Sequence, residues 1–285
     1  MKVISLALLM MACCITGAVA QTTADYAPPA GFDQKQENVT YGKLVYHTYQ
    51  STTTGRERKC YALLPPGYDA EKEYPILYLL HGIGGDHNEW LGGKPDAVIG
   101  NLINAGKARE MIVIIPNIRA RANDSVNGSD MYSPAHFAAF DNFINDLKND
   151  LMPFIESKYK IAPGRENAAI AGLSMGGREA LYIGLTMSDT FGYVGAFCPA
   201  PGVLPYDVEK GLFEKENFAP RTEDDTFILI NAGASDGVVG DWPQAYSDAL
   251  TENGVEHIFY VTAGGHDFNV WKHGLYNFVS RIFQD

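Results

Sequence analysis

The chain has 285 residues, 46% of them hydrophobic and 12% aromatic, which is enough to build the core of one large domain. Its 34 acidic residues outnumber its 22 basic residues, and the formal net charge at pH 7 is −12. A chain with this excess of acidic groups lacks the basic surface that nucleic acids and anionic membranes require. We therefore expect neither of them as a partner.

The N-terminal segment has the pattern of a secretory signal peptide over residues 1–20. Lys2 precedes an apolar stretch at residues 3–15, and Ala18-Val19-Ala20 forms a small-residue cleavage site. We expect a secreted or periplasmic protein with no membrane association after cleavage, because the apolar stretch is too short for a membrane span. The alternative is a lipoprotein signal that leaves a lipid anchor on Cys13. The short apolar region and the good cleavage site favour export without lipid.

The remainder of the chain is expected to form a linker or arm followed by one domain. Residues 21–39 are polar and contain Pro28 and Pro29, which indicates a linker or an N-terminal arm. Over residues 40–285 strand-like and helix-like segments alternate, which predicts a single α/β domain with a doubly wound, mostly parallel sheet. The strands are expected at residues 43–49, 59–64, 76–80, 112–115, 168–171, 193–198, 227–231 and 258–261.

A helix is expected between the fourth and fifth strands, where apolar residues recur at helical spacing. Its core-facing residues are Phe140, Phe143, Ile144, Leu147, Leu151 and Ile155. Pro153 has no N–H group to donate within this helix, so we expect a kink there.

The most informative motif is Gly172-Leu173-Ser174-Met175-Gly176, which lies between an apolar strand and a helix-like segment. Strand, sharp turn and helix form the context of a nucleophile elbow, which exposes a serine hydroxyl at the C-terminal edge of a sheet. The turn strains the serine backbone and is tolerated only where the residues two before and two after lack bulk. Gly172 and Gly176 meet this requirement, so Ser174 is the expected nucleophile.

An acid and a base for this serine are expected later in the chain, in the order serine, acid, histidine, each at the end of a strand. Asp236 follows the strand at 227–231, and His266 follows the strand at 258–261 on a glycine-rich turn. Taken singly, Asp236 is typical of a turn and His266 of a solvated loop. Their order and their strand-end positions together favour a triad. Asp224, Asp225 and Asp241 stay open as alternatives for the acid, and His47, His87 and His136 are expected at the surface.

The oxyanion formed during ester cleavage needs two backbone N–H donors, one after the nucleophile and one from the loop after an early strand. Met175 follows Ser174 and supplies the first donor. His81 ends an early apolar strand and leads into Gly82-Ile83-Gly84-Gly85, whose glycines leave the backbone around Ile83 bare. Ile83 N–H is therefore the expected second donor. The alternative is a glycine-rich turn without a catalytic role.

Four segments of the chain carry a family resemblance. The first runs from Arg58 to the end of Leu-Pro-Pro-Gly-Tyr at 64–68. The other three are Leu-Leu-His-Gly-Ile-Gly-Gly at 79–85, Leu-Ser-Met-Gly-Gly at 173–177 and Gly-Gly-His-Asp-Phe-Asn-Val-Trp at 264–271. Together they resemble carbohydrate esterase family 1, the feruloyl and acetyl xylan esterases, which are akin to esterase D and the mycolyltransferases. The resemblance covers residues 40–285 and implies an α/β-hydrolase fold and a serine mechanism without metal or cofactor. It assigns the nucleophile to Ser174, the base to His266, the acid to Asp236 and the oxyanion donors to Ile83 and Met175.

The same resemblance implies a carboxylesterase that acts on ester-substituted xylan or xylo-oligosaccharide. Candidate aromatic walls for the acyl group are Trp90, Trp242 and the loop at 199–206 with Tyr206. A ferulate ring would stack on such walls, whereas an acetyl group needs only a small slot. We favour a feruloyl esterase, with an acetyl xylan esterase as the alternative. An acyltransferase on the same triad and a carbohydrate-binding protein with an inactive site also stay open.

Two cysteines remain after removal of residues 1–20, namely Cys60 in the second strand and Cys198 at the end of the sixth. Two cysteines in an exported protein invite a disulfide. In the strand order that the resemblance implies, 1-2-4-3-5-6-7-8, four steps of about 4.8 Å put them roughly 19 Å apart. A disulfide requires Cα atoms within about 7 Å, so we expect both thiols to be free.

Overall fold

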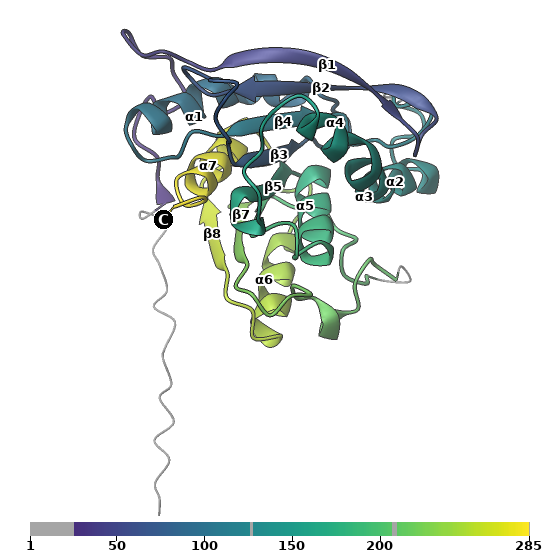
Figure 1. The fold of residues 1–285 in the computed structure, drawn as a ribbon. Helices are drawn as coiled ribbons and strands as arrows, with labels where there is room; N and C mark the ends of the chain where they lie inside the picture. Colours follow the sequence, from purple (N-terminus) through teal and green to yellow (C-terminus); the bar gives the residue numbers. More distant parts are fainter. Residues whose placement is uncertain (1–25, 126–127, 207–209, 285) are drawn as a thin grey trace, which may run out of the picture.

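A computed structural model describes residues 26–125, 128–206 and 210–284 and is built around an eight-stranded sheet (Figure 1). The strands are β1 (Lys43–Ser51), β2 (Arg56–Leu64), β3 (Ile76–Leu80), β4 (Ile112–Pro116), β5 (Ala168–Leu173), β6 (Tyr193–Phe197), β7 (Phe227–Gly233) and β8 (Ile258–Thr262). Their order is β1-β2-β4-β3-β5-β6-β7-β8, with β2 antiparallel to both neighbours and β3 to β8 parallel. The predicted mostly parallel sheet, its strand order and its single domain are confirmed.

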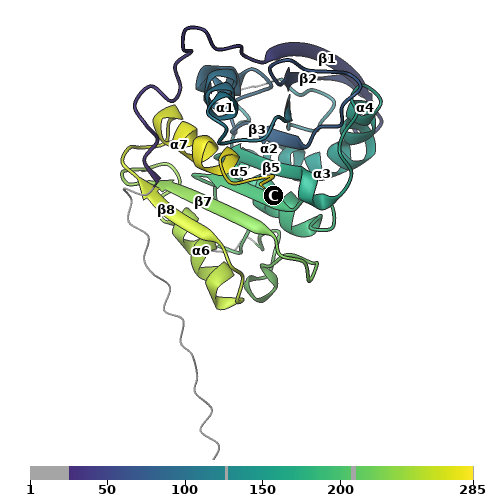
Figure 2. The same ribbon diagram turned by 60° about the vertical axis from the view of Figure 1, so that its left-hand side comes forward.

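Helices cover both faces of the sheet (Figures 1 and 2). The α-helices are α1 (Pro95–Asn104), α2 (Pro134–Asp141), α3 (Phe143–Asp146), α4 (Met152–Glu156), α5 (Met175–Thr186), α6 (Trp242–Glu252) and α7 (Phe268–Val279). Short turns are η2 (Glu89–Gly93), η3 (Leu147–Leu151), η4 (Arg165–Asn167) and η5 (Lys215–Asn217), of which η3 is π-helical. α1 packs against α7 on one face, and α5 and α6 lie on the other, as right-handed crossovers between parallel strands require. Within the described ranges, no helix has the length and apolar character needed to cross a bilayer.

The helix expected around residues 140–155 forms in pieces. Its predicted stripe is buried, with Ile144 partly so, but α3 gives way to η3 before α4 begins. Pro153 cannot donate to the carbonyl four residues earlier, and its ring crowds that carbonyl. A wide π-helical turn, η3, stands directly before α4, at the place where this crowding would fall.

Residues 26–39 lie against the domain as an arm. Tyr26 stacks on Tyr260 of β8 with ring centroids 4.2 Å apart. Asp33 forms an ion pair with Lys272 of α7, which holds the pKa of that carboxyl below its usual value. Asn101 of α1 donates to two arm carbonyls. Residues 26–39 therefore pack against the domain; the predicted signal peptide and Cys13 lie outside the described residues.

The hairpin of β1 and β2 is fastened to η3 by a buried carboxylate. Asp150 accepts from Thr52 N–H at 2.8 Å, Thr52 Oγ1 at 2.7 Å and Thr53 N–H at 3.0 Å. Burial opposes ionisation, but these hydrogen bonds lower the pKa of Asp150 to about 2. A carboxyl whose pKa falls on folding stabilises the protein above about pH 4, and the stabilisation is lost as the pH falls towards 2.

Asp150→Asn should therefore lower the free energy of unfolding at pH 7 by about 2 kcal/mol. Urea unfolding of the variant and the parent protein measures this difference. It should shrink as the pH is lowered from 4 towards 2, because the parent protein then protonates Asp150 as well. A difference that does not change with pH would show that charge plays no part in this contact.

Cys60 and Cys198 are both buried and free, as expected from the strand order. Cys60 lies in β2, and Cys198 follows β6, four strands further across the sheet. Titration of the denatured, unreduced protein without residues 1–20 should find two thiols per chain. A count of zero in a monomeric sample would contradict the strand order.

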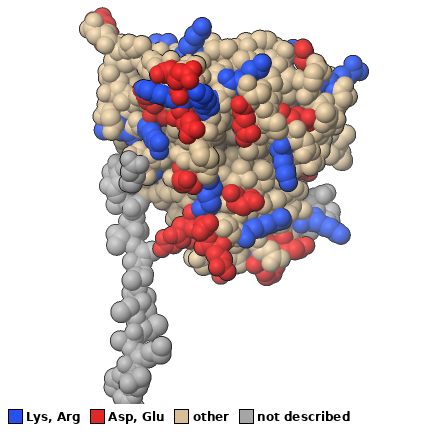
Figure 3. All heavy atoms as spheres, viewed as in Figure 1, with Lys and Arg blue, Asp and Glu red and all other residues tan. Residues whose placement is uncertain are grey.

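The parallel strands bring distant residues to one edge of the sheet. Leu80 at the end of β3 pairs with Gly172 of β5, and Phe197 of β6 pairs with Leu173 on one side and Asn231 on the other. The loops after β3, β5, β7 and β8 therefore open at the same edge. On the face shown in Figure 3, acidic and basic side chains are interspersed.

Candidate active site

Ser174 lies in a strained turn between β5 and α5. Its backbone has φ 52° and ψ −118°, in the left-handed half of conformational space that non-glycine residues avoid. A Cβ atom on Gly172 would lie 2.5 Å from the backbone of Gly176, and one on Gly176 would lie 2.3 Å from the Leu80 carbonyl oxygen. Both contacts are with backbone, which cannot move aside cheaply. Gly172 is thus required for β5 and α5 to meet closely, and Gly176 for α5 to approach the end of β3, in agreement with the predicted need for residues without bulk at both positions.

Ser174, His266 and Asp236 form a chain of hydrogen bonds. His266 Nε2 lies 2.9 Å from Ser174 Oγ, and His266 Nδ1 lies 2.7 Å from Asp236 Oδ2. Because an ionised carboxylate only accepts hydrogen bonds, Nδ1 carries a proton and Nε2 is the acceptor for the serine hydroxyl. The Trp271 ring stands edge-on to the imidazole, 5.0 Å between centroids, and restricts its rotation.

The side chain of Asp236 is oriented by two backbone amides that follow it in the same loop. Its second oxygen, Oδ1, accepts from Val238 N–H at 2.9 Å and Val239 N–H at 3.2 Å. Burial opposes ionisation, but the bonds from His266 and these two amides hold the pKa of Asp236 below its usual value. It is therefore a carboxylate at neutral pH. Asp224, Asp225 and Asp241, the alternatives considered for the acid, are exposed, and the histidine pairs with Asp236 instead.

Cys198 lies next to Asp236 and His266 of this hydrogen-bonded chain. Ligand atoms of Cys198, Asp236 and His266 all lie within 4.8 Å of one another, a set whose chemistry could bind a metal ion. A metal would need the thiolate, whereas burial and the neighbouring Asp236 charge raise the pKa of Cys198 well above its usual value. The carboxylate and the imidazole are already bonded to each other. This arrangement fits a hydrogen-bonded triad better than a metal centre.

The peptide group that joins Gly82 to Ile83, in the loop after β3, is oriented by His81. Ile118 N–H donates to His81 Nε2 at 2.9 Å, so the proton of this histidine is on Nδ1, which donates to the Gly82 carbonyl at 2.7 Å. Burial lowers the pKa of His81 to about 4, which keeps the ring neutral. Gly82 C=O and Ile83 N–H share one trans peptide plane and point in opposite directions. With the carbonyl fixed towards His81, the N–H is directed away from it.

Three further side chains clamp the same loop. Arg119 donates to the Ile83 carbonyl at 3.2 Å and to the Gly85 carbonyl at 2.7 Å, and His136 Nε2 lies 3.1 Å from the Ile83 carbonyl. Glu89 accepts from Gly82 N–H at 2.6 Å. His136 and His87 are both buried, so their expected place at the surface is wrong; Ile83, whose carbonyl bonds to His136, lies 53 residues away in the sequence.

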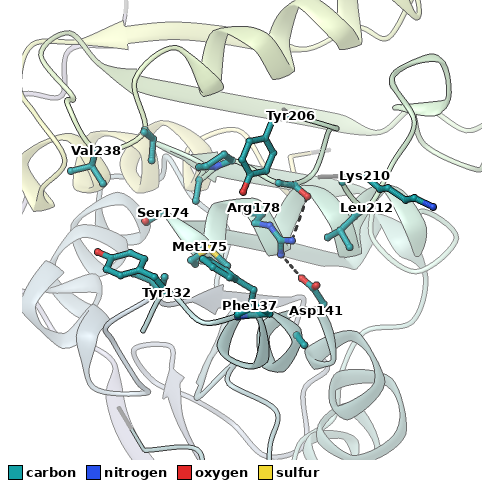
Figure 4. Close-up of a pocket in the computed structure, with 18 residues that line it drawn as sticks. Tyr132, Phe137, Asp141, Ser174, Met175, Arg178, Tyr206, Lys210, Leu212 and Val238 are labelled. Carbon is teal, nitrogen blue, oxygen red and sulfur yellow. Dashed lines mark hydrogen bonds and ion pairs between the residues drawn. The ribbon is translucent and has the colours of Figure 1, made fainter. Parts of the chain in front are cut away.

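Ile83, Ser174 and Met175 line one cavity of about 790 Å³ (Figure 4). Met175 begins α5, so its N–H has no acceptor within the helix and is free to bind an anion. Both predicted oxyanion donors therefore border the same space as the serine. The other walls of this cavity include the side chains of Tyr132, Phe137, Tyr206, Leu212 and Val238.

The structure places only some of the predicted aromatic walls at the cavity. Tyr206 lines the cavity, as do Ala200, Pro201 and Gly202 from the same loop. Trp90 does not: it is fully buried, donates to the Leu80 carbonyl at 2.8 Å and packs edge-on against Phe268. Its place as an acyl wall is wrong, and it instead supports the segment that follows His266.

Trp242 also stands outside the cavity lining. It packs edge-on behind Tyr206, with ring centroids 5.4 Å apart, and so supports a wall without forming one. Tyr132 and Phe137, which the sequence did not single out, come from the segment around the start of α2. No periodicity or motif marks them as wall residues, because only the tertiary fold places them opposite Tyr206.

A strained serine after β5, with a carboxylate after β7 and a histidine after β8, defines the class of α/β-hydrolase-fold serine hydrolases. Comparison with known proteins identifies the family. The family model described as "Putative esterase" matches residues 51–282. A CE1 ferulic acid esterase from Anaeromyces mucronatus, solved without substrate, is 40% identical over 90% of this chain and 97% of its own, with a TM-score of 0.85. The chain therefore belongs to carbohydrate esterase family 1.

A second structure of the fungal enzyme and two xylanases are also similar to the chain. The same fungal enzyme solved in complex with ferulic acid is 38% identical, covers 90% of this chain and 97% of its own, and has a TM-score of 0.84. An endo-1,4-beta-xylanase/feruloyl esterase from Xylanibacter ruminicola is 32% identical over 87% of this chain. The chain spans only 32% of that relative and 18% of the xylanase Y from Acetivibrio thermocellus.

Proposed function

We propose that this protein hydrolyses carboxylic esters through an acyl-enzyme on Ser174, and that the acyl group is feruloyl or a related hydroxycinnamoyl group borne by xylan. The observation that carries this proposal is the hydrogen-bonded chain Ser174–His266–Asp236, which opens into a large cavity with aromatic walls. Membership of carbohydrate esterase family 1 and the named activities of its relatives support it.

Each residue has a defined part in the proposed reaction. His266 Nε2 takes the proton of the Ser174 hydroxyl as its oxygen attacks the ester carbonyl, and Asp236 stabilises the resulting imidazolium. Ile83 N–H and Met175 N–H bind the oxyanion of the tetrahedral intermediate. His266 returns the proton to the leaving alcohol. Water then repeats these steps on the acyl-enzyme and releases the acid.

The size of the cavity favours an aromatic acyl group. A volume of about 790 Å³ is in the range that binds whole small molecules, and an acetyl group would leave most of it empty. Tyr132, Phe137 and Tyr206 offer ring faces and edges on which a flat cinnamoyl group can stack. This supports a feruloyl esterase over an acetyl xylan esterase.

Three substrates test the proposal. p-Nitrophenyl acetate separates an active esterase from a carbohydrate-binding protein, and methyl ferulate against acetylated xylan separates the two acyl specificities. We expect cleavage of the first two and a much higher kcat/KM for methyl ferulate than for the acetyl groups of xylan. Preference for acetylated xylan would overturn the feruloyl assignment. Transfer of ferulate to an added sugar in preference to water would favour the acyltransferase.

Activity should be independent of metal ions. In the proposed mechanism backbone N–H groups and an imidazole balance all developing charge. Hydrolysis of methyl ferulate should therefore keep its full rate after exhaustive treatment with EDTA. A loss of activity that zinc or calcium restores would contradict the metal-free mechanism and would draw attention to the cluster of Cys198, Asp236 and His266.

A further inference from the structure

A cluster of charged side chains lies on the cavity wall away from the serine. Arg178 Nη1 donates to Asp141 Oδ1 at 2.5 Å and also bonds to Glu179, and Arg178 Nη2 lies 3.4 Å from the Gly202 carbonyl. Asp141 ends α2, and Arg178 and Glu179 belong to the second turn of α5. Figure 4 shows Ser174 towards one side of the cavity and the pair of Arg178 and Asp141 towards the other.

The three members of this cluster differ in access to the cavity. The side chain of Glu179 is fully buried and that of Arg178 is 6% exposed, whereas that of Asp141 is 33% exposed and lines the cavity. Burial raises the pKa of Glu179 above its usual value, although Arg178 opposes this shift. Two carboxyl groups thus share one guanidinium, and Asp141 is the one that a bound molecule can reach.

Asp141 has acceptor capacity to spare. Among the described residues, its carboxylate is bonded only through Oδ1, to Arg178. An ionised carboxylate can accept on both oxygens, so Oδ2 can take a hydrogen bond from a bound molecule. Burying a charged cluster beside a mainly apolar cavity is costly, and a hydrophobic set of the same shape would fill the space at no such cost. An acceptor oxygen on Asp141 that a bound molecule can reach is a reason for a charged cluster to stand here in spite of this cost.

We propose that Asp141, held in place by Arg178, accepts the phenolic O–H of a 4-hydroxycinnamoyl group whose ester carbonyl lies at Ser174. This inference rests on the proposed function and names the part of the acyl group that the site recognises. A cinnamoyl group is flat and stiff, with its carbonyl and its 4-hydroxyl at opposite ends. The cavity also places its two polar groups apart, because Ser174 and Asp141 both line it, Arg178 lies one turn beyond Ser174 at the start of α5, and the Arg178 side chain extends away from the serine towards Asp141.

The chemistry of the acceptor predicts which acyl groups are preferred. A phenolic hydroxyl donates a hydrogen bond to the carboxylate of Asp141. A methoxy group in the same position has no proton to donate, so it places a second acceptor next to the carboxylate and leaves Oδ2 of the carboxylate without a hydrogen-bond partner. A site built to bind a substrate hydroxyl discriminates against analogues that lack it. Because Asp141 is partly exposed, we expect a preference for methyl ferulate over methyl 3,4-dimethoxycinnamate of on the order of 10- to 100-fold in kcat/KM.

The test compares methyl ferulate, methyl 4-hydroxycinnamate, methyl cinnamate and methyl 3,4-dimethoxycinnamate on the parent protein and on Asp141→Leu. Glu179 still pairs with Arg178 in this variant, so the guanidinium is not left alone in the wall. We expect the preference for the two 4-hydroxy esters to fall to within a few-fold of unity. Asp141→Asn, which keeps the shape and one acceptor oxygen, should give an intermediate preference. Asp248→Leu, an exposed aspartate on α6, should keep the preference of the parent protein.

The outcomes separate this inference from the proposed function. Equal losses on all four esters in both Asp141 variants would show a structural ion pair and overturn the inference. A parent protein that cleaves the four esters without preference would overturn it as well, while the feruloyl assignment stands. A parent protein that cleaves p-nitrophenyl acetate but none of the four cinnamates would overturn both.

Discussion

Ser174→Ala should lower kcat for methyl ferulate by on the order of 10⁴- to 10⁶-fold, as in other serine hydrolases. The variant loses the atom that would form the acyl-enzyme, while the oxyanion donors and the cavity remain. His266→Ala should cause a loss of similar size, because the serine hydroxyl then has no base at the 2.9 Å separation seen here. Initial rates with methyl ferulate measure both effects.

Two controls accompany these variants. The double variant Ser174→Ala/His266→Ala should be no slower than either single variant, because residues that act as one unit give non-additive losses. Far-ultraviolet circular dichroism and thermal unfolding should resemble those of the parent protein. Retention of near-normal activity by either single variant in a folded sample would remove that residue from the mechanism.

Asp236→Asn should lower kcat by on the order of 10³- to 10⁴-fold, with the fold intact. The amide can keep the two bonds from Val238 N–H and Val239 N–H through its oxygen. Its NH₂ group then points at His266 Nδ1, which must become the acceptor. The imidazole proton moves to Nε2, where it faces Ser174 and blocks transfer of the serine proton.

The same assay identifies the acid. Asp224→Asn provides a matched control, because this carboxyl is exposed and bonds to nearby Thr222. It should keep the rate of the parent protein. If Asp236→Asn were near normal and another aspartate variant were slow, the acid role would pass to that other residue, and the 2.7 Å contact with His266 would be structural.

Local sequence signals predicted the sheet and the arrangement around the serine. The central parallel strands β3, β4 and β5 are buried on both faces, so each is a continuous apolar run that is easily recognised in the sequence. Because parallel strands end at a common edge, residues just beyond them were bound to meet, which is why Ser174, Asp236 and His266 could be placed together. The order of the strands came from the family resemblance and not from local patterns.

Contacts between segments that are far apart in the sequence could not be predicted from such local signals. Trp90 follows a glycine-rich loop and looks like a wall residue, but Phe197 and Phe268 enclose it from remote parts of the chain. The same holds for Asp141 and Arg178, which are 37 positions apart and meet only because α2 lies beside α5. No sequence pattern marks the contacts of Trp90 or the ion pair of Asp141 with Arg178, because the packing of whole elements brings these residues together.

Labelling with a serine-directed organophosphonate tests the central claim most directly. After inactivation, intact mass should show one phosphonate per chain, and peptide mapping should place it on Ser174, with hydrolysis of methyl ferulate lost in proportion to labelling. The Ser174→Ala variant should take up no label. Full activity in labelled protein, or a stoichiometric adduct on another residue with Ser174 unmodified, would contradict an acyl-enzyme mechanism at this serine.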